Sequence, residues 1–434
     1  MTEEQYQTWG SGMGFILACI GSAVGIGNIW RFPYIVGENG GGAFLLPFLV
    51  IVASFGLLLM LLEFSIGRRY KLSIVSGMAN ISKNFKWGGA VIAIVAFAML
   101  SYYLVILGWI LSFFISNAAQ SFLDFDQFTQ SYYPILSFFA VLGITFIIVR
   151  RGISSGIEQF NKVGILFLIG IIVPLMVYAI MLPNATEGIS YFLEPDLTKI
   201  SEPHIWSTAF GQAFFSLSLG SGSLLTYGSY LRGKHSLIRS SSIIISANTM
   251  ISIFAGLMIF SFVFSSGMDP QGGIPLIFDV LPTVFSDMSW GFFVGAVFFF
   301  LLLVAGLTSA VGLFQVPNAS LQDVFKISNK KSSVIIGLAL VAIGLPSSLS
   351  YSAVDLDLFG VSFLDGMDHI FGIYGITISE LIFVVIVTWF VDKKKILEHI
   401  NSTSRFNIPP IAISILKYTV PVVIVITLVT TALT

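Results

Sequence analysis

The sequence has little of what soluble enzymes and secreted domains use. It contains one cysteine, Cys19, so neither a disulfide nor a multi-cysteine metal site can form within one chain. Its four histidines, at 204, 235, 369 and 399, are scattered without metal-ligand spacing or an adjacent nucleophile. Charged residues make up only 10% of the chain, and no basic arm or phosphate-binding loop is visible. These absences disfavour a membrane enzyme and a partner that is a nucleic acid.

Hydrophobic residues, by contrast, make up 56% of the 434 positions. A helix needs about 20 apolar residues to cross a bilayer, and this length predicts an all-α polytopic membrane protein with eleven spans. The spans fall near 11–36, 42–66, 89–117, 133–149, 158–182, 205–230, 240–264, 289–318, 333–350, 366–391 and 410–433. The longest connections, near 183–204 and 267–288, are too short for a separate catalytic domain. We therefore expect residues 1–434 to form one transmembrane domain.

Charge divides the loops into two alternating sets. Basic residues gather at 68–86, 150–151, 232–239, 326–331 and 393–405, whereas the loops near 121–132, 183–204, 267–288 and 351–365 are acidic and contain one base, Lys199. Cytoplasmic loops carry the excess of lysine and arginine. This pattern predicts a cytoplasmic N-terminus and an extracellular C-terminus in a cell membrane. We expect no cleavable signal peptide, because the first span follows a polar N-terminus and continues into GSAVGIGN.

The first span contains GSAVGIGNIWRF at 21–32, with three glycines, Asn28 and Arg31 at bilayer depth. Glycine weakens a helix, and an arginine near mid-membrane costs about 2.5–3.5 kcal/mol on insertion scales. A broken helix that holds a ligand accounts for all of these residues. Gly21 and Gly25 also form a GxxxG pattern, which is common where helices pack closely.

The sixth span contains a second run of small and polar residues, SLSLGSGS at 216–223. An offset of five spans inverts the second half relative to the first. We therefore expect an inverted repeat, with one unit near 11–182, the other near 205–391, and an extra helix near 410–433. Matched breaks in two such halves indicate a midplane binding site in secondary transporters, because hydrocarbon cannot satisfy the freed backbone groups.

Several motifs now resemble the bacterial amino-acid branch of the neurotransmitter:sodium symporter family, which has the leucine-transporter-type fold. They are GSAVGIGNIWRFPY, ENGGGAFLLPF (38–48), RGISSGIEQF (151–160), QAFFSLSLGSGSLLTYGSY (212–230), AGLTSA (305–310) and LDGMDHIFGIYG (364–375). The rule that matched breaks indicate a midplane binding site is known in part from this family. The agreement in topology is therefore not independent evidence for the resemblance. The resemblance implies sodium-coupled import of amino acids by alternating access. A ligand-gated channel or an amino-acid sensor on the same scaffold is the alternative.

Two sodium sites are implied. In the eighth span, Ala305, Thr308 and Ser309 stand at i, i+3 and i+4 and share one helix face. The resemblance pairs them with the carbonyls of Gly21 and Val24. Hydrogen bonding of the two hydroxyls to their own helix is the alternative. The other site takes the Ala23 carbonyl, Asn28, Asn248, Ser216 and the carboxylate of the substrate.

The resemblance also implies an amino-acid site. Gly25 stands where amine-transporting relatives have an aspartate, so the substrate is expected to bring its own carboxylate. That carboxylate would meet the amides of Ile26 and Gly27 and the Tyr103 hydroxyl, although Tyr103 alone is also compatible with an interfacial aromatic. The ammonium would meet the carbonyls of Ala23, Phe215 and Ser218. The side-chain pocket contains Met99, Phe215, Ser218, Ser221, Ser309 and Leu313, which favours neutral aliphatic or aromatic side chains. Ser216 is also expected to contact the substrate.

Gates and a hinge follow from the same resemblance. Arg31 and Asp368 match an outer gate pair above a Tyr103–Phe215 lid, and a permanent buried ion pair is the alternative. At the inner face Asp323 is present, but Tyr6 replaces the family's N-terminal arginine. Gly164 and Pro174 suggest a fifth span that unwinds. The intramembrane acids Glu63 and Glu380 are expected in a structural network.

A chloride site is the last expectation. Ser252 occupies the position where chloride-independent bacterial relatives carry a carboxylate, and Gln212, Ser216 and Asn248 offer further donors. Phe48 replaces a tyrosine of chloride-binding members, which predicts weak chloride binding. The sequence leaves the physiological amino acid and the oligomeric state open.

Overall fold

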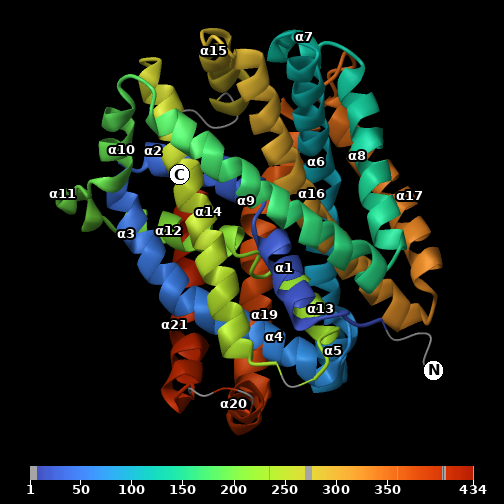
Figure 1. The fold of residues 1–434 in the computed structure, drawn as a ribbon. Coiled ribbons are helices and arrows are strands. Elements are labelled where there is room, and N and C mark those ends of the chain that lie inside the picture. The colour runs from blue at the N-terminus through green and yellow to red at the C-terminus, as the bar shows by residue number, and fades with distance from the viewer. Residues whose placement is uncertain are drawn as a thin grey trace.

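The computed structural model describes residues 7–233, 235–268, 276–358, 360–402, 404 and 407–433. Within these ranges the protein is a bundle of helices (Figure 1), and the only strands are the antiparallel pair β1 (Asp357–Leu358) and β2 (Val361–Ser362) in a connecting loop. The expected all-α class is confirmed. Tyr6, Lys234, Asp269 and Arg405, on which parts of the gate and charge interpretations depend, lie outside the described residues.

Nine helices or continuous helix runs among the described residues are long and apolar enough to cross a membrane. They are α3–η3–α4 (Gly42–Tyr70), η4–α6 (Lys83–Ala118), α8 (Tyr133–Arg150), η5–α9 (Ile153–Ile180), α14 (Leu237–Ser265), α16 (Gly291–Phe325), α17 (Asn329–Leu349), α18–η7–α19 (Phe363–Phe390) and α21 (Pro410–Leu433). The expected spans match these helices within a few residues at most ends. The largest difference is α16, which continues seven residues beyond the expected end at 318.

Short helices fill the connections that the sequence left as loops. They are α5 (Ile74–Ile81), α7 (Phe125–Thr129), α10 (Ala185–Leu193), α11 (Leu197–Ile200), η6 (Leu276–Val280), α15 (Leu281–Ser286) and α20 (Lys393–Asn401). Several begin at a polar N-cap, as α7 does at Asp124 and α20 at Asp392. Such a cap accepts a backbone N–H of the first turn.

The first expected break is present. Helix α1 (Gly12–Ala23) ends at Val24, whose ψ of 102° is extended, and the chain resumes at η2 (Gly27–Arg31) and α2 (Phe32–Glu38) at an angle of 53° to α1. The side chain of Asn28 satisfies a backbone group within the break, because its Oδ1 accepts the Gly25 amide at 3.2 Å. The polar residues of this span therefore satisfy backbone groups that the break frees.

The second break divides the expected span 205–230 into α12 (Pro203–Ser216) and α13 (Ser223–Ser229). Ser218, Gly220 and Gly222 have φ values of 55°, 75° and 74°, and this left-handed conformation cannot continue a right-handed helix. The buried carboxylate of Glu63 on α4 accepts the freed amides of Gly220 at 3.0 Å and Leu225 at 3.2 Å. Glu63 thus holds the second break together.

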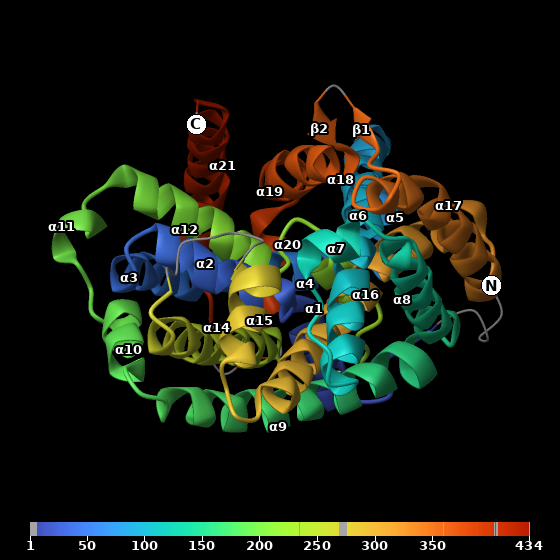
Figure 2. The ribbon, with the colours of Figure 1, turned by 90° about the horizontal axis from the view of Figure 1, so that it is seen from above.

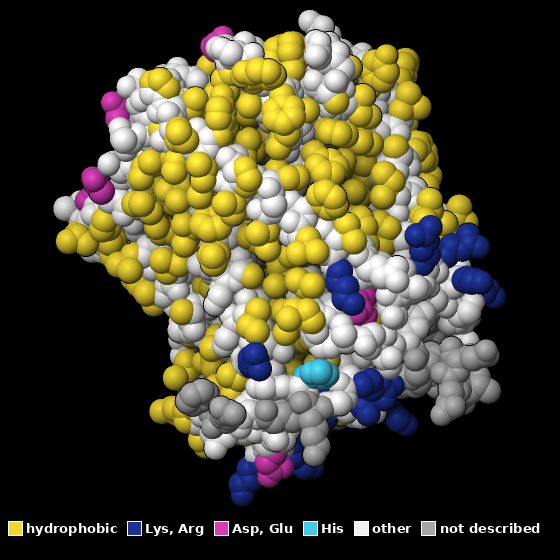
Figure 3. Space-filling model, in the orientation of Figure 1, with side chains coloured by type: hydrophobic (Ala, Val, Ile, Leu, Met, Phe, Trp, Pro, Cys, Tyr) yellow, Lys and Arg dark blue, Asp and Glu magenta, His cyan; other side chains and the backbone are white. Residues whose placement is uncertain are grey.

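Helix α1 lies in the middle of the bundle, in contact with α9, α14 and α16. Helix α9 runs along one edge of the molecule when seen from above (Figure 2), and side chains such as Leu166 and Phe167 are 67% and 54% exposed on it. Hydrophobic side chains cover much of the face in Figure 3, while lysines and arginines gather toward the end near α20. An apolar exposed surface of this kind fits contact with lipid.

Candidate functional site

A cavity of about 280 Å³ lies between the two broken helices. Ten of the eleven expected substrate residues line it: Ala23, Ile26, Gly27, Met99, Tyr103, Phe215, Ser218, Ser221, Ser309 and Leu313. The eleventh, Ser216, is fully buried beside the cavity in a cluster around Asn28. The volume is near the lower end of the range for small-molecule sites.

One wall of the cavity is the break in the first span. The Ile26 amide points toward the Tyr103 hydroxyl oxygen at 3.4 Å, so two groups that can donate to an anion lie side by side. A Cβ atom built on Gly25 would stand 2.5 Å from Ser309 Oγ and 3.1 Å from the Tyr103 oxygen. Only glycine fits there without displacing these two side chains.

The opposite wall is the break in the second span. Ser218 Oγ donates to the Ser22 carbonyl at 2.8 Å and ties the two breaks together. Ser221 Oγ donates to the Ser218 carbonyl at 2.7 Å, and a carbonyl oxygen can accept a second donor. Among the described residues, the charged side chains that line the cavity are Arg31 on η2, Asp365 on α18 (Phe363–Met367) and Asp368 on η7 (Asp368–Gly375).

The expected ligands of one sodium site are close together. Ser309 Oγ lies 3.2 Å from the Gly21 carbonyl oxygen and 3.3 Å from that of Val24. Thr308 Oγ1 donates to the Ala305 carbonyl at 2.8 Å, as in the alternative interpretation of an isolated threonine, but its lone pairs remain available. The Ser309 hydroxyl therefore joins α16 to the end of α1 and its break, and Thr308 and Ala305 lie within one turn of Ser309 on α16.

The ligands of the other sodium site form a second polar cluster. Asn28 Nδ2 lies 2.8 Å from Ser216 Oγ, 2.9 Å from Asn248 Oδ1 and 2.8 Å from Ser252 Oγ. Gln212 Nε2 donates to the Gly27 carbonyl at 3.4 Å, and its buried Oε1 has no partner among the described residues. The residues expected to bind chloride thus adjoin those expected to bind sodium.

The two sides of the expected outer gate line the same cavity but are not paired. Among the described residues, no ion pair within 4.0 Å joins Arg31 to Asp368. The Arg31 guanidinium lies over the Phe215 ring at 4.3 Å from its centroid, a favourable cation–π distance. Neither a gate pair nor a permanent ion pair between Arg31 and Asp368 is therefore formed in this conformation.

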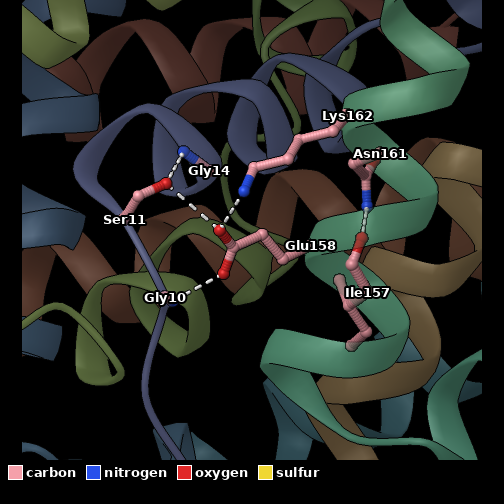
Figure 4. Close-up of polar contacts among 7 residues, drawn as sticks. All are labelled: Gly10, Ser11, Gly14, Ile157, Glu158, Asn161 and Lys162. Atoms are coloured by element: carbon pink, nitrogen blue, oxygen red, sulfur yellow. Dashed lines mark hydrogen bonds and ion pairs between the residues drawn. The ribbon is translucent and has the colours of Figure 1, made fainter.

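At the other end of the bundle, Asp323 accepts the Ser73 amide at 2.5 Å, and the Trp9 indole donates to the Tyr227 carbonyl at 2.9 Å. A third contact there, which no sequence motif predicted, is shown in Figure 4. Glu158, 2% exposed, accepts the Gly10 amide at 2.6 Å and Ser11 Oγ at 3.2 Å, and Lys162 Nζ lies 2.6 Å from it. Glu158 lies within the motif RGISSGIEQF. The rule that acidic residues inside a membrane span are functional candidates could have identified it from the sequence.

The expected hinge residues lie in one continuous helix. Gly164 and Pro174 are both within α9 (Gln159–Ile180). A Cβ atom built on Gly164 would stand 3.1 Å from Thr308 Cγ2. The glycine therefore brings α9 directly against the Thr308 site, and α9 is helical there in this conformation.

Two broken helices that enclose a cavity within a bundle of apolar helices define a membrane transport protein. A sequence model of the Sodium:neurotransmitter symporter family matches residues 6–135 and 124–434, and the chain belongs to this family. It is a multi-pass transporter and not an enzyme. The family and the fold expected from the motifs are thus confirmed.

Individual relatives agree with this assignment. A sodium-dependent transporter of Methanocaldococcus jannaschii is 34% identical over 434 residues, which cover 94% of this chain and 87% of the relative. The crystal structure of MhsT in complex with L-phenylalanine matches with a TM-score of 0.88 and 34% identity, over 98% of this chain and 99% of that one. The sodium- and chloride-dependent creatine transporter 1 of Bos taurus is 28% identical over 366 residues, 70% of this chain and 58% of the relative.

Proposed function

We propose that this protein imports neutral amino acids with apolar side chains together with sodium, by alternating access. The observation that carries the proposal is the cavity wall at Gly25, where the Ile26 amide lies beside the Tyr103 hydroxyl and Ser309 leaves no room for an aspartate side chain of the protein. A substrate that brings its own carboxylate fits this wall. The MhsT structure, solved with L-phenylalanine, supports an amino acid as that substrate.

The opposite wall of the cavity suits the ammonium group and the side chain of an amino acid. The Ala23, Phe215 and Ser218 carbonyls are the groups to accept its ammonium, and Met99, Phe215 and Leu313 offer apolar surface to its side chain. One methylene in such a pocket changes binding by about 1–3 kcal/mol. We therefore expect the protein to accept several aliphatic and aromatic amino acids.

Sodium would occupy the Thr308 site and the Asn28 site. The neutral oxygens of the Thr308 site suit a hard cation, and the substrate carboxylate would complete the Asn28 site and couple ion to substrate. Two sodium ions moved with a zwitterion gain about 4.6 kcal/mol at 100 mV. Tenfold sodium gradients add about 1.4 kcal/mol for each ion. The total of roughly 7 kcal/mol supports accumulation near 10⁵-fold.

The same proposal assigns the gates and the membrane. Arg31 and Asp368 close the outer side when substrate is bound, Tyr103 and Phe215 cover the substrate, and α9 opens between Gly164 and Pro174 on the inner side. Asp323 belongs to the inner gate. The basic end of the bundle faces the cytoplasm of a cell membrane, with the N-terminus inside and the C-terminus outside.

The test is uptake of radiolabelled amino acids into proteoliposomes under an inward sodium gradient, with each standard amino acid as competitor. We expect accumulation above the external concentration that collapses when the gradient is removed. A ligand-gated channel would equilibrate its solute without accumulating it, and a sensor would bind without flux. Either result would contradict the proposal.

A further inference from the structure

We propose that Asn161 is a further sodium ligand, whose side-chain carbonyl completes the Thr308 site on the side of α9. The proposal rests on the proposed function, which places sodium at that site. Asn161 is fully buried, and its Oδ1 has no hydrogen-bond partner among the described residues. A buried amide oxygen left without a donor costs free energy, so its presence calls for a partner that binds there.

The hydrogen bonding of Asn161 fixes the direction of that oxygen. Its Nδ2 donates to the Ile157 carbonyl one turn earlier in the same helical run, at 2.8 Å (Figure 4). The amide nitrogen is therefore directed along its own helix, and Oδ1 is directed away from it toward α1. A Cβ atom built on Gly21 would collide with Asn161 Oδ1 and would stand 3.1 Å from Thr308 Cβ.

Gly21 thus lies between Asn161 and Thr308. Its carbonyl is one oxygen of the Thr308 site, and the Thr308 hydroxyl is another. The ammonium group of Lys162, the next residue after Asn161, extends to Glu158 (Figure 4). The free oxygen of Asn161 therefore adjoins Gly21 and Thr308 and is not paired with Lys162. The carbonyl oxygen of an amide is a suitable ligand for a hard cation.

The protein contains a matched case without such a site. Asn117 on α6 is also buried, its Nδ2 donates to the Phe113 carbonyl at 2.9 Å, and its Oδ1 is also without a hydrogen-bond partner and faces a glycine, Gly295. The next neighbour of Gly295 is the apolar ring of Phe285. In Asn117 the amide oxygen is therefore packed only against a glycine, where a weak Cα–H contact is possible. Asn117 thus serves as a comparison for Asn161 without neighbouring ligand oxygens.

The experiment is a sodium titration of the apparent melting temperature of the purified full chain in detergent, with N-methylglucamine holding ionic strength constant. We expect Asn161→Ala to raise the half-saturating sodium concentration roughly tenfold, the loss of one ligand bond. Asn117→Ala should leave that concentration unchanged although it removes the same packing contact. In a Thr308→Ala background, Asn161→Ala should have no further effect, whereas in an Asn28→Ala background its effect should persist.

Asn161→Asp keeps the experiment decisive if the alanine variant does not fold. Protons and sodium would compete for a carboxylate at a ligand position, so the half-saturating sodium concentration should fall more steeply from pH 6 to pH 9 than in the wild type. Equal sodium responses of the Asn161→Ala and Asn117→Ala variants, or a wild-type pH profile for Asn161→Asp, would overturn the proposal. A wild type that shows no sodium response would instead overturn the proposed function.

Discussion

The backbone amide of Gly10 donates a 2.6 Å hydrogen bond to Oε2 of Glu158, which joins the segment before α1 to the beginning of the fifth span. Ser11 Oγ, which also caps α1 at Gly14, donates to the other carboxylate oxygen at 3.2 Å. A Cβ atom built on Gly14 would collide with Glu158. One buried acid therefore holds the start of α1 at the end of the bundle where the family's arginine is missing.

We predict that Glu158→Gln loosens the start of α1. An amide accepts fewer and weaker hydrogen bonds than a carboxylate, so α1 should open more often and expose the native thiol of Cys19, which is fully buried. The rate of alkylation of Cys19 by N-ethylmaleimide should rise several-fold. The control is Lys162→Met, which removes only the 39% exposed partner of Glu158 and should leave the rate near that of the wild type. Equal rates in all three proteins would show that Glu158 does not hold α1.

Thr308→Ala and Asn28→Ala should each weaken sodium binding sharply, because each removes an oxygen from one proposed site. The measurement is the sodium concentration at half-maximal uptake in proteoliposomes. Thr145→Ala is a matched control, since Thr145 is also fully buried and donates to a carbonyl of its own helix, that of Val141, at 2.9 Å. Normal sodium dependence in both site variants would contradict the assignment of the sites.

Tyr103→Phe should weaken substrate binding by about 1–3 kcal/mol, the cost of losing a hydrogen bond to a charged group. The dissociation constant of the preferred amino acid, measured by scintillation proximity, should therefore rise by about 5- to 150-fold. The control is Tyr227→Phe, because the buried Tyr227 hydroxyl has no partner among the described residues. An unchanged affinity in Tyr103→Phe would mean that the carboxylate binds elsewhere.

Stability should fall in mild acid because of His399 on α20, outside the spans. Burial, and then the charges of Arg68 and Arg69, lower the pKa of His399 to about 4, and its Nε2 accepts from Arg68 Nε at 2.9 Å. A pKa below the unfolded value means that this stabilisation is complete above about pH 6.5 and is lost as the pH falls toward 4.

The loss should be about 1–2 kcal/mol, less than the full shift implies because His399 is only partly buried and solvent screens its charge. The apparent melting temperature between pH 7 and pH 4 should therefore fall more in the wild type than in His399→Gln, whose side-chain oxygen can accept from Arg68 without titrating. Parallel curves for the two proteins would contradict this role of His399.

Replacing chloride by gluconate should lower uptake in the wild type. Ser252 Oγ lies 2.8 Å from Asn28 Nδ2, so the cluster contains donors that suit an anion but no carboxylate of its own. Ser252→Glu would supply the charge and should make uptake indifferent to the anion. Wild-type uptake that does not respond to chloride would show that another acid, such as Glu63, supplies the charge.

Local composition was enough to predict the two breaks and the helix face that carries Thr308 and Ser309. Glycine and polar residues disrupt a membrane helix wherever they occur, and positions i, i+3 and i+4 share a face in any α-helix. Local composition and helix periodicity were not enough to decide whether Ser216 lines the substrate cavity. Its side chain lies instead against Asn28 and Asn248, because α12 ends there and directs it toward the first and seventh spans.

The sequence by itself determined that the chain crosses the membrane many times, that two of its spans are broken, and which residue types stand at the breaks. These properties depend on hydropathy, helix periodicity and backbone preference, which act over a few residues. Only the tertiary structure decided that Arg31 lies over Phe215 and apart from Asp368, and that Glu158 and Asn161 face Gly10 and Gly21. Those contacts join segments more than a hundred residues apart, so they depend on how whole helices pack against one another.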